Sequence, residues 1–189
     1  MLIASGYILN CLREKECVSI YPWIDKPCNV RRASDMVREI KIPDVPAVEL
    51  LQSNPSPQLS MCAGDFVEVY SRPESKAKWN AVVTCFFIDT APVLHEYVET
   101  IMHALKPGGV WINHGPLLWH WRCPFENTTD PRYAKSVEFS FDEVEHIIRS
   151  YGFEFLSTEW RKCDYDANCR AMMRMSYDTV LFVARKPLV

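Results

Sequence analysis

The sequence predicts an α/β protein with a largely parallel sheet and helices on its faces, and three observations predict it. Residues 80–88 (NAVVTCFFI) form a nearly continuous apolar run rich in β-branched and aromatic side chains, which is typical of a strand buried on both faces. A helical stripe of apolar residues follows at 94–105, and a second apolar strand pattern follows at 110–113. Strands that alternate with helices favour parallel pairing, and ligands then bind at the carboxyl ends of the strands.

The later part of the chain continues this alternation. Ser140 and Glu143 have the spacing of a capping box, which predicts a helix that begins there and ends before Gly152. Residues 153–159 and 179–185 are then predicted to be two further strands.

The N-terminal part is less regular. Apolar positions in residues 2–12 recur at helical spacing and predict an amphipathic helix. Residues 13–58 carry much of the proline, which favours an irregular embellishment, and residues 59–63 predict a short strand. We therefore expect residues 1–58 to form the embellishment and residues 59–189 to form the main part of the domain.

Composition and charge exclude several classes of protein. The 189 residues carry a formal net charge of −3 and no dense block of lysine and arginine, so neither nucleic acid nor a membrane surface is indicated as a partner. The eight cysteines form no C-x-x-C pair, which predicts no metal site. With no signal peptide pattern, we expect a reduced protein of the cytoplasm or the nucleus.

Several segments together resemble one known family. The helix that ends in LKPGG (105–109) is common in class I, Rossmann-like methyltransferases. The finer likeness is to the carnosine N-methyltransferase family. It is carried, in order and nearly in spacing, by YPWI (21–24), NVRRASD (29–35), AGDF (63–66), CFFIDTA (85–91), LKPGGVWIN (105–113), GPLLWH (115–120) and VLFVARKP (180–187). The resemblance covers essentially the whole chain.

The resemblance implies a function and a set of site residues. The cofactor would be S-adenosylmethionine, and its methyl group would pass to an imidazole nitrogen of carnosine to give anserine; peptide or protein histidines stay open as acceptors. Asp89 matches the acidic residue that contacts the imidazole and is the expected catalytic residue, with His120 and Tyr177 as further acceptor-binding residues. The residues expected on the cofactor side are Asp65, Phe66, Cys85 and Tyr97.

The chemistry of these side chains agrees with those roles, and simpler interpretations stand beside them. The Asp89 carboxylate can accept the imidazole N–H and so leave the other ring nitrogen with a free lone pair. We also expect Trp119, Trp121 and Tyr177 to form an aromatic wall around the flat ring. Equally, Asp89 is near the start of a predicted helix and suits a capping role, and Asp65 with Phe66 suits a simple turn.

The sequence also departs from the family pattern. It holds six glycines and no G-x-G run, whereas the superfamily uses a glycine-rich turn and an acidic residue to hold the cofactor. We expect both, and the first two strands of the sheet, to lie upstream of this chain. The sheet would then be partial, residues 80–88 would form an exposed apolar edge, and the chain alone would bind S-adenosylmethionine weakly or not at all.

Two smaller departures concern the acceptor side. Residues 121–135 are longer than their counterpart in the family, and Met175 stands where a tyrosine is expected. Two other functions stay open beside the carnosine enzyme. One is a non-catalytic remnant that binds a partner, or dimerises, through its exposed edge; the other is a class I methyltransferase for a different acceptor, such as a protein histidine.

Overall fold

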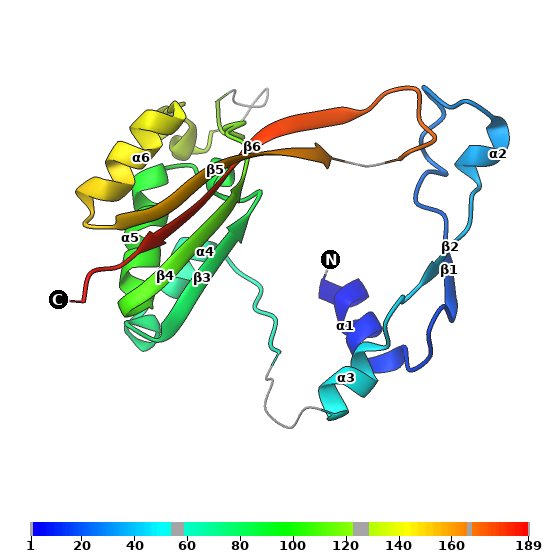
Figure 1. Ribbon diagram of the computed structural model, residues 1–189, viewed down its shortest axis with the longest axis horizontal. Helices are drawn as coiled ribbons and strands as arrows, with labels where there is room; N and C mark the ends of the chain where they lie inside the picture. The colour runs from blue at the N-terminus through cyan, green and yellow to red at the C-terminus, as the bar shows by residue number, and fades with distance from the viewer. Residues whose placement is uncertain (1, 54–58, 123–128, 166–167, 189) are drawn as a thin grey trace. The chain divides into compact units, whose positions relative to one another are not determined.

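The computed structural model describes residues 2–53, 59–122, 129–165 and 168–188, drawn in Figure 1. The chain divides into two compact units. The first comprises residues 1–63 and 166–175, and the second comprises residues 64–165 and 176–189. Residues 166–175 thus group with the N-terminal residues, although they follow and precede strands of the second unit.

A mixed sheet forms the centre of the second unit. Its strands are β3 (Trp79–Cys85), β4 (Leu105–Gly115), β5 (Glu154–Tyr165) and β6 (Met175–Arg185), in the order β3-β4-β6-β5. β3 and β4 are parallel, whereas β4 and β6 are antiparallel. The predicted α/β class is therefore confirmed. The prediction of a largely parallel sheet is wrong, because β6 follows β5 without an intervening helix and runs against β4.

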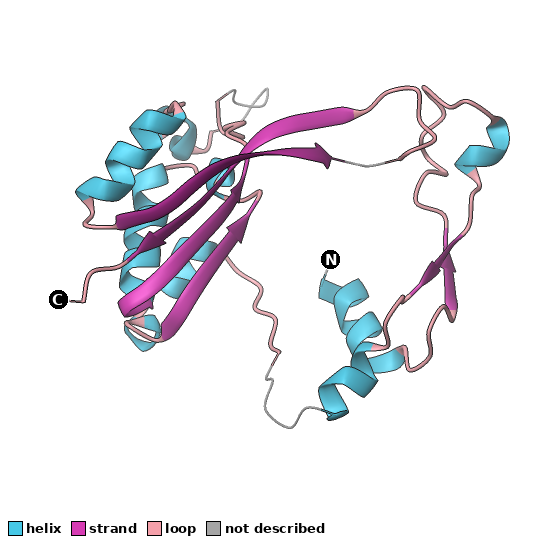
Figure 2. Ribbon diagram, in the orientation of Figure 1, coloured by secondary structure: helices cyan, strands magenta, loops and turns pink. Residues whose placement is uncertain are grey.

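The helices of this unit are α4 (Phe66–Tyr70), α5 (Leu94–Ala104) and α6 (Phe141–Ser150), and Figure 2 shows α5 and α6 together on one side of the sheet. The capping box predicted for α6 is present: the backbone N–H of Ser140 donates to Glu143 Oε2 at 2.8 Å. That bond satisfies a donor that the first turn of a helix leaves without an intrahelical partner.

The core lies between these helices and one face of the sheet. Trp111, Phe182 and Ala184 are each 0% exposed and contribute the strand side of this core. Thr84 joins it to β3, because the Trp111 Nε1–H donates to Thr84 Oγ1 at 2.8 Å. Alternate residues of the same strands belong to the opposite face, and there Val83 is 68% exposed.

β3 lies at one edge of the sheet, with β4 as its only neighbour among the described strands. Its apolar side chains are partly uncovered, as expected from the sequence, since Trp79 is 40% exposed in addition to Val83. The strand predicted at residues 59–63 is absent: that segment has no regular structure, and its residues are exposed. A strand needs a hydrogen-bonded neighbour, and no described segment pairs with it.

The described residues of the first unit form three helices and a two-stranded sheet: α1 (Leu2–Cys11), α2 (Ala33–Met36), α3 (Ala47–Ser53), β1 (Val18–Ile20) and β2 (Ile40–Ile42). β1 and β2 pair in antiparallel orientation. The helix predicted at the N-terminus is present, but it is not amphipathic, because its apolar side chains lie on all sides. None of the described helices combines the length and the apolar character needed to cross a membrane.

Candidate functional site

The predicted site residues that follow β3 and β4 come together because these two strands are parallel. Cys85 at the end of β3 is paired with His114 near the end of β4, so both strands finish at the same edge of the sheet. The 3-10 helix η2 (Ile88–Thr90) follows β3 there, and residues 116–120 follow β4. The N-terminal half of β6 reaches the same edge, since Val180 is paired with Gly115.

Asp89 lies in η2 and is only 2% exposed. Its Oδ2 accepts the backbone N–H of Leu118 at 3.0 Å, and its backbone carbonyl accepts the N–H of His120 at 3.0 Å. Oδ1 has no partner among the described residues. Asp89 therefore has one carboxylate oxygen that no described residue engages and that could accept an N–H from a ligand.

His120 and Trp121 lie beside Asp89 along the loop that follows β4. The His120 side chain is exposed, while the Trp121 Nε1–H donates to the carbonyl of Thr90 at 3.0 Å. Trp121 also packs against Tyr133, with ring centroids 4.7 Å apart, and under the guanidinium of Arg132. The loop after β4 is thus tied to η2 by backbone and side-chain hydrogen bonds.

Trp119 does not belong to the site. Its side chain is 6% exposed, packs in the hydrophobic core and donates to the carbonyl of Phe139 at 2.9 Å. The expected aromatic wall of Trp119, Trp121 and Tyr177 is therefore wrong in its first member. A positive φ of 47° at Trp119 turns its side chain inward, and the neighbouring sequence gives no sign of such a turn.

Tyr177 belongs to an aromatic cluster that the sequence did not reveal. Its ring centroid lies 6.1 Å from that of Phe86 and 6.0 Å from that of Tyr165. Phe86 and Tyr165 are 5.6 Å apart, so the three rings contact one another. Phe86 and Tyr165 were missed because the contact depends on the antiparallel placement of β6, which periodicity does not show.

A second aromatic cluster holds two of the residues expected on the cofactor side. Tyr97 of α5 stacks on Phe87 with centroids 5.1 Å apart, and Phe66 lies 5.0 Å from Tyr97 and 5.2 Å from Phe87. Burial raises the pKa of the Tyr97 phenol above its ordinary value of 10.0, although a hydrogen bond with Thr90 lowers it in part. The cluster is apolar and flat-sided, which suits an aromatic ligand.

The other two residues expected on the cofactor side have different surroundings. Asp65 caps α4, since its Oδ1 accepts the N–H of Val67 at 2.9 Å and that of Glu68 at 3.2 Å. Its Oδ2 lies 3.9 Å from Nη1 of Arg132. Cys85 is exposed at the end of the edge strand and is a free thiol. The structure thus brings Phe66 and Tyr97 together and gives Asp65 a helix-capping role.

The backbone between the two clusters is tightly constrained. Phe86 has a positive φ of 49°, a conformation that costs a non-glycine residue about 1–2 kcal/mol. A Cβ added at Gly115 would lie 3.0 Å from the nitrogen of Phe86 and 3.1 Å from its Cα. A side chain at position 115 would therefore press on the Phe86 backbone, whose conformation accompanies the contact of the Phe86 ring with Tyr177 and of the Phe87 ring with Tyr97.

The described residues fit only part of an S-adenosylmethionine site. The cluster of Phe66, Phe87 and Tyr97 suits the adenine ring, but the 189-residue sequence contains no G-x-G turn for the rest of the molecule. Within the described ranges, no three of the histidine, cysteine, aspartate and glutamate side chains are grouped so as to hold a metal ion.

Comparison with known proteins identifies the family to which the chain belongs. A sequence profile described as carnosine N-methyltransferase matches residues 1–188, and the chain belongs to this family. It is 41% identical over 188 residues to the carnosine N-methyltransferase of Rattus norvegicus, covering 99% of this chain and 44% of that protein. With the carnosine N-methyltransferase of Schizosaccharomyces pombe it shares 35% identity over 187 residues, covering 98% of this chain and 50% of that protein. The chain therefore spans about half the length of these relatives.

Among solved structures, an S-adenosylmethionine-dependent methyltransferase of Methanosarcina mazei is similar, with a TM-score of 0.44 and 14% identity, covering 76% of this chain and 77% of the other. The membership rests on the family profile and on the sequence relatives.

Proposed function

We propose that this chain forms the acceptor-binding part of an S-adenosylmethionine-dependent methyltransferase that methylates an imidazole nitrogen, with carnosine as the acceptor and anserine as the product. The observation that carries the proposal is the state of the Asp89 carboxylate. One of its oxygens accepts a backbone N–H, and the other accepts no hydrogen bond from the described residues. The family membership and the names of its relatives support the reaction class and the acceptor.

The chain's own residues would act by orienting the acceptor. When bound, S-adenosylmethionine supplies an electrophilic methyl group. Asp89 Oδ1 accepts the N–H of the neutral imidazole, which leaves the lone pair of the other ring nitrogen free to attack. The ring would become cationic as the new N–C bond forms and the bond between that carbon and the sulfonium sulfur breaks, with the cofactor leaving as a neutral thioether. The Asp89 carboxylate would stabilise the charge of the ring until the ring proton is released to solvent. His120 and Tyr177 would hold the remainder of the dipeptide.

The test is methyl transfer to carnosine by the natural protein that carries these residues. Replacing Asp89 by Asn keeps the size of the side chain but removes the charge. The expected result is a fall in kcat/KM for carnosine of about 10- to 100-fold, the effect of losing a hydrogen bond to a charged group. Unchanged turnover would remove Asp89 from the acceptor site.

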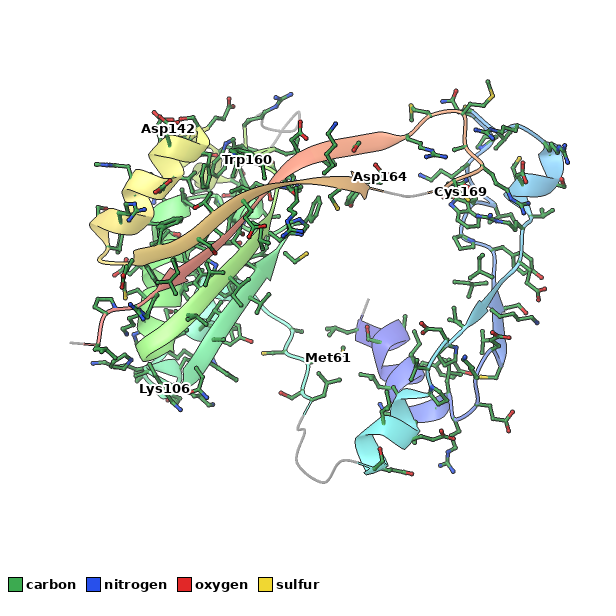
Figure 3. All side chains as sticks on the ribbon, viewed as in Figure 1. Met61, Lys106, Asp142, Trp160, Asp164 and Cys169 are labelled. Atoms are coloured by element: carbon green, nitrogen blue, oxygen red, sulfur yellow. The ribbon has the colours of Figure 1, made fainter. Side chains whose placement is uncertain are left out.

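The matched control is Asp142→Asn. Asp142 is an exposed aspartate in the first turn of α6 (Figure 3), outside both η2 and the loop that follows β4. Its replacement is expected to leave kcat/KM unchanged. A panel with carnosine, free histidine and a histidine-containing peptide then identifies the acceptor, and a preference for the peptide would replace carnosine by a protein histidine.

A further inference from the structure

His114 is a histidine at the strand edge that the proposed mechanism does not use. It lies in β4, where its Cα is paired with Cys85 on one side and with Leu181 on the other. The side chain is half-buried. Its ring is perpendicular to that of Phe86, with centroids 6.0 Å apart.

The hydrogen bonds around Thr179 fix which nitrogen of His114 carries a proton. The Thr179 Oγ1 lies 2.9 Å from the carbonyl of Arg161 and 2.8 Å from Nε2 of His114. A carbonyl only accepts, so the single hydroxyl proton of Thr179 goes to Arg161. His114 Nε2 must therefore donate to Thr179, and Nδ1 of the neutral ring keeps its lone pair.

Nδ1 of His114 makes no hydrogen bond with any residue that the structure describes, so its lone pair can accept one from a ligand. The ring itself cannot turn freely, because Thr179 is 0% exposed and holds the opposite nitrogen. The structure thus holds a hydrogen-bond acceptor in a fixed direction.

His114 also borders the cluster that contains Tyr177. Phe86 contacts the ring of His114 on one side and the rings of Tyr165 and Tyr177 on the other. An atom bound at Nδ1 would therefore lie at the rim of the proposed acceptor site. The π-faces and the lone pair both attract a donor group of positive character and disfavour a carboxylate.

We propose that His114 is a specificity-determining residue of the acceptor site, whose Nδ1 accepts a hydrogen bond from an N–H of the acceptor, either its amino group or its peptide nitrogen. The inference rests on the proposed function. Thr179 is the positioning residue, because it sets the tautomer of His114.

The test compares two replacements of His114 in the natural protein, assayed for methyl transfer to carnosine. His114→Leu removes both ring nitrogens, whereas the amide oxygen of His114→Asn can occupy the place of Nδ1. We expect the leucine variant to raise KM for carnosine about tenfold and the asparagine variant to restore most of the loss. KM for S-adenosylmethionine and kcat are expected to stay unchanged in both, and a leucine variant with an unchanged KM for carnosine would overturn the inference.

Modified acceptors identify the donor. Acetylation blocks the amino group of the acceptor. If it abolishes the difference in KM between wild type and His114→Leu, the amino group is the donor. If the difference in KM persists, the donor is the peptide N–H. Removal of the acceptor's carboxylate is expected to leave the difference intact. Loss of the difference in that arm would show that His114 binds the carboxylate and would overturn the inference.

A separate measurement tests the tautomer without any activity. Long-range ¹H–¹⁵N spectra of the labelled 189-residue chain at mildly alkaline pH are expected to show Nε2–H for His114, and Thr179→Val is expected to abolish that preference while Thr179→Ser keeps it. An Nδ1–H tautomer in the wild type would overturn the inference. Absence of methyl transfer by the wild-type protein would instead refute the proposed function, and the inference with it.

Discussion

At the scale of single residues, Tyr97 shows how burial and function overlap. Its ring is 7% exposed and stacks on Phe87, so the same packing that forms the core also raises the pKa of the phenol. The first cause of that shift is the loss of hydration, which penalises the tyrosinate. A group that stays protonated to a higher pH in the folded state than in the unfolded chain makes the stability of the fold depend on pH.

We therefore expect Tyr97 to destabilise the fold in alkali. Because its folded pKa is raised above 10.0, its contribution to stability is fully present below that pH and is lost as the pH rises through the folded value. The measurement is chemical unfolding on both sides of pH 10, together with tyrosinate absorbance. Tyr97→Phe should remove both the late-titrating signal and part of the alkaline loss. Tyr7→Phe, at a 52% exposed position, is the control and should change neither.

At the scale of elements, the sequence predicted those whose signal is local. The capping box of α6 and the apolar stripe of α5 depend on neighbours three and four residues apart, and both helices form where expected. The strand at residues 59–63 failed because strand formation depends on a partner elsewhere. β6 begins at Met175, before the predicted residue 179, because its N-terminal part extends past the end of β4.

The edge strand β3 predicts self-association. Its outer hydrogen-bonding groups face no described strand, and Val83 presents an apolar side chain that is 68% exposed. Val83→Lys places a charge on this edge, and we expect it to reduce association of the purified chain. Because the Val83 side chain lies outside the core, we expect the unfolding temperature to stay nearly unchanged. Sedimentation velocity at several concentrations measures the effect.

Val137→Lys adds the same charge outside the sheet, at a residue that is 56% exposed. If both variants reduce association equally, net charge and not the β3 edge is responsible. If only Val83→Lys does so, the edge is the contact, as expected for a chain that binds a partner through it.

At the scale of the whole molecule, the sequence indicated the family and the position of Asp89 but not the arrangement around it. Asp89 and His120 follow strand ends, which local patterns reveal. The contact of Tyr177 with Phe86 and the burial of Trp119 depend on pairings between residues far apart in the chain. The tautomer of His114 is set by Thr179, 65 residues away, and no sequence pattern carries that information.

Cofactor binding is a property that we expect the 189 residues not to have by themselves. They contain the aromatic cluster of Phe66, Phe87 and Tyr97, which we propose faces one end of the cofactor, but no glycine-rich turn whose backbone N–H groups could reach the other end. Isothermal titration of the purified chain with S-adenosylmethionine should show no binding at micromolar concentrations. The carnosine N-methyltransferase of Rattus norvegicus is the positive control, and micromolar binding by the 189-residue chain would contradict the expectation.

The two hydrogen bonds between Asp89 and the residues after β4 have a thermodynamic consequence. They fix Leu118 and His120 relative to the carboxylate before any ligand arrives. An acceptor that binds here therefore does not have to order this stretch of backbone, and the conformational entropy lost on binding is smaller than for a mobile loop. Such a preorganised loop favours high affinity for one acceptor over the binding of many different acceptors. It distinguishes acceptors by their shape, because it does not rearrange to fit an acceptor of a different shape.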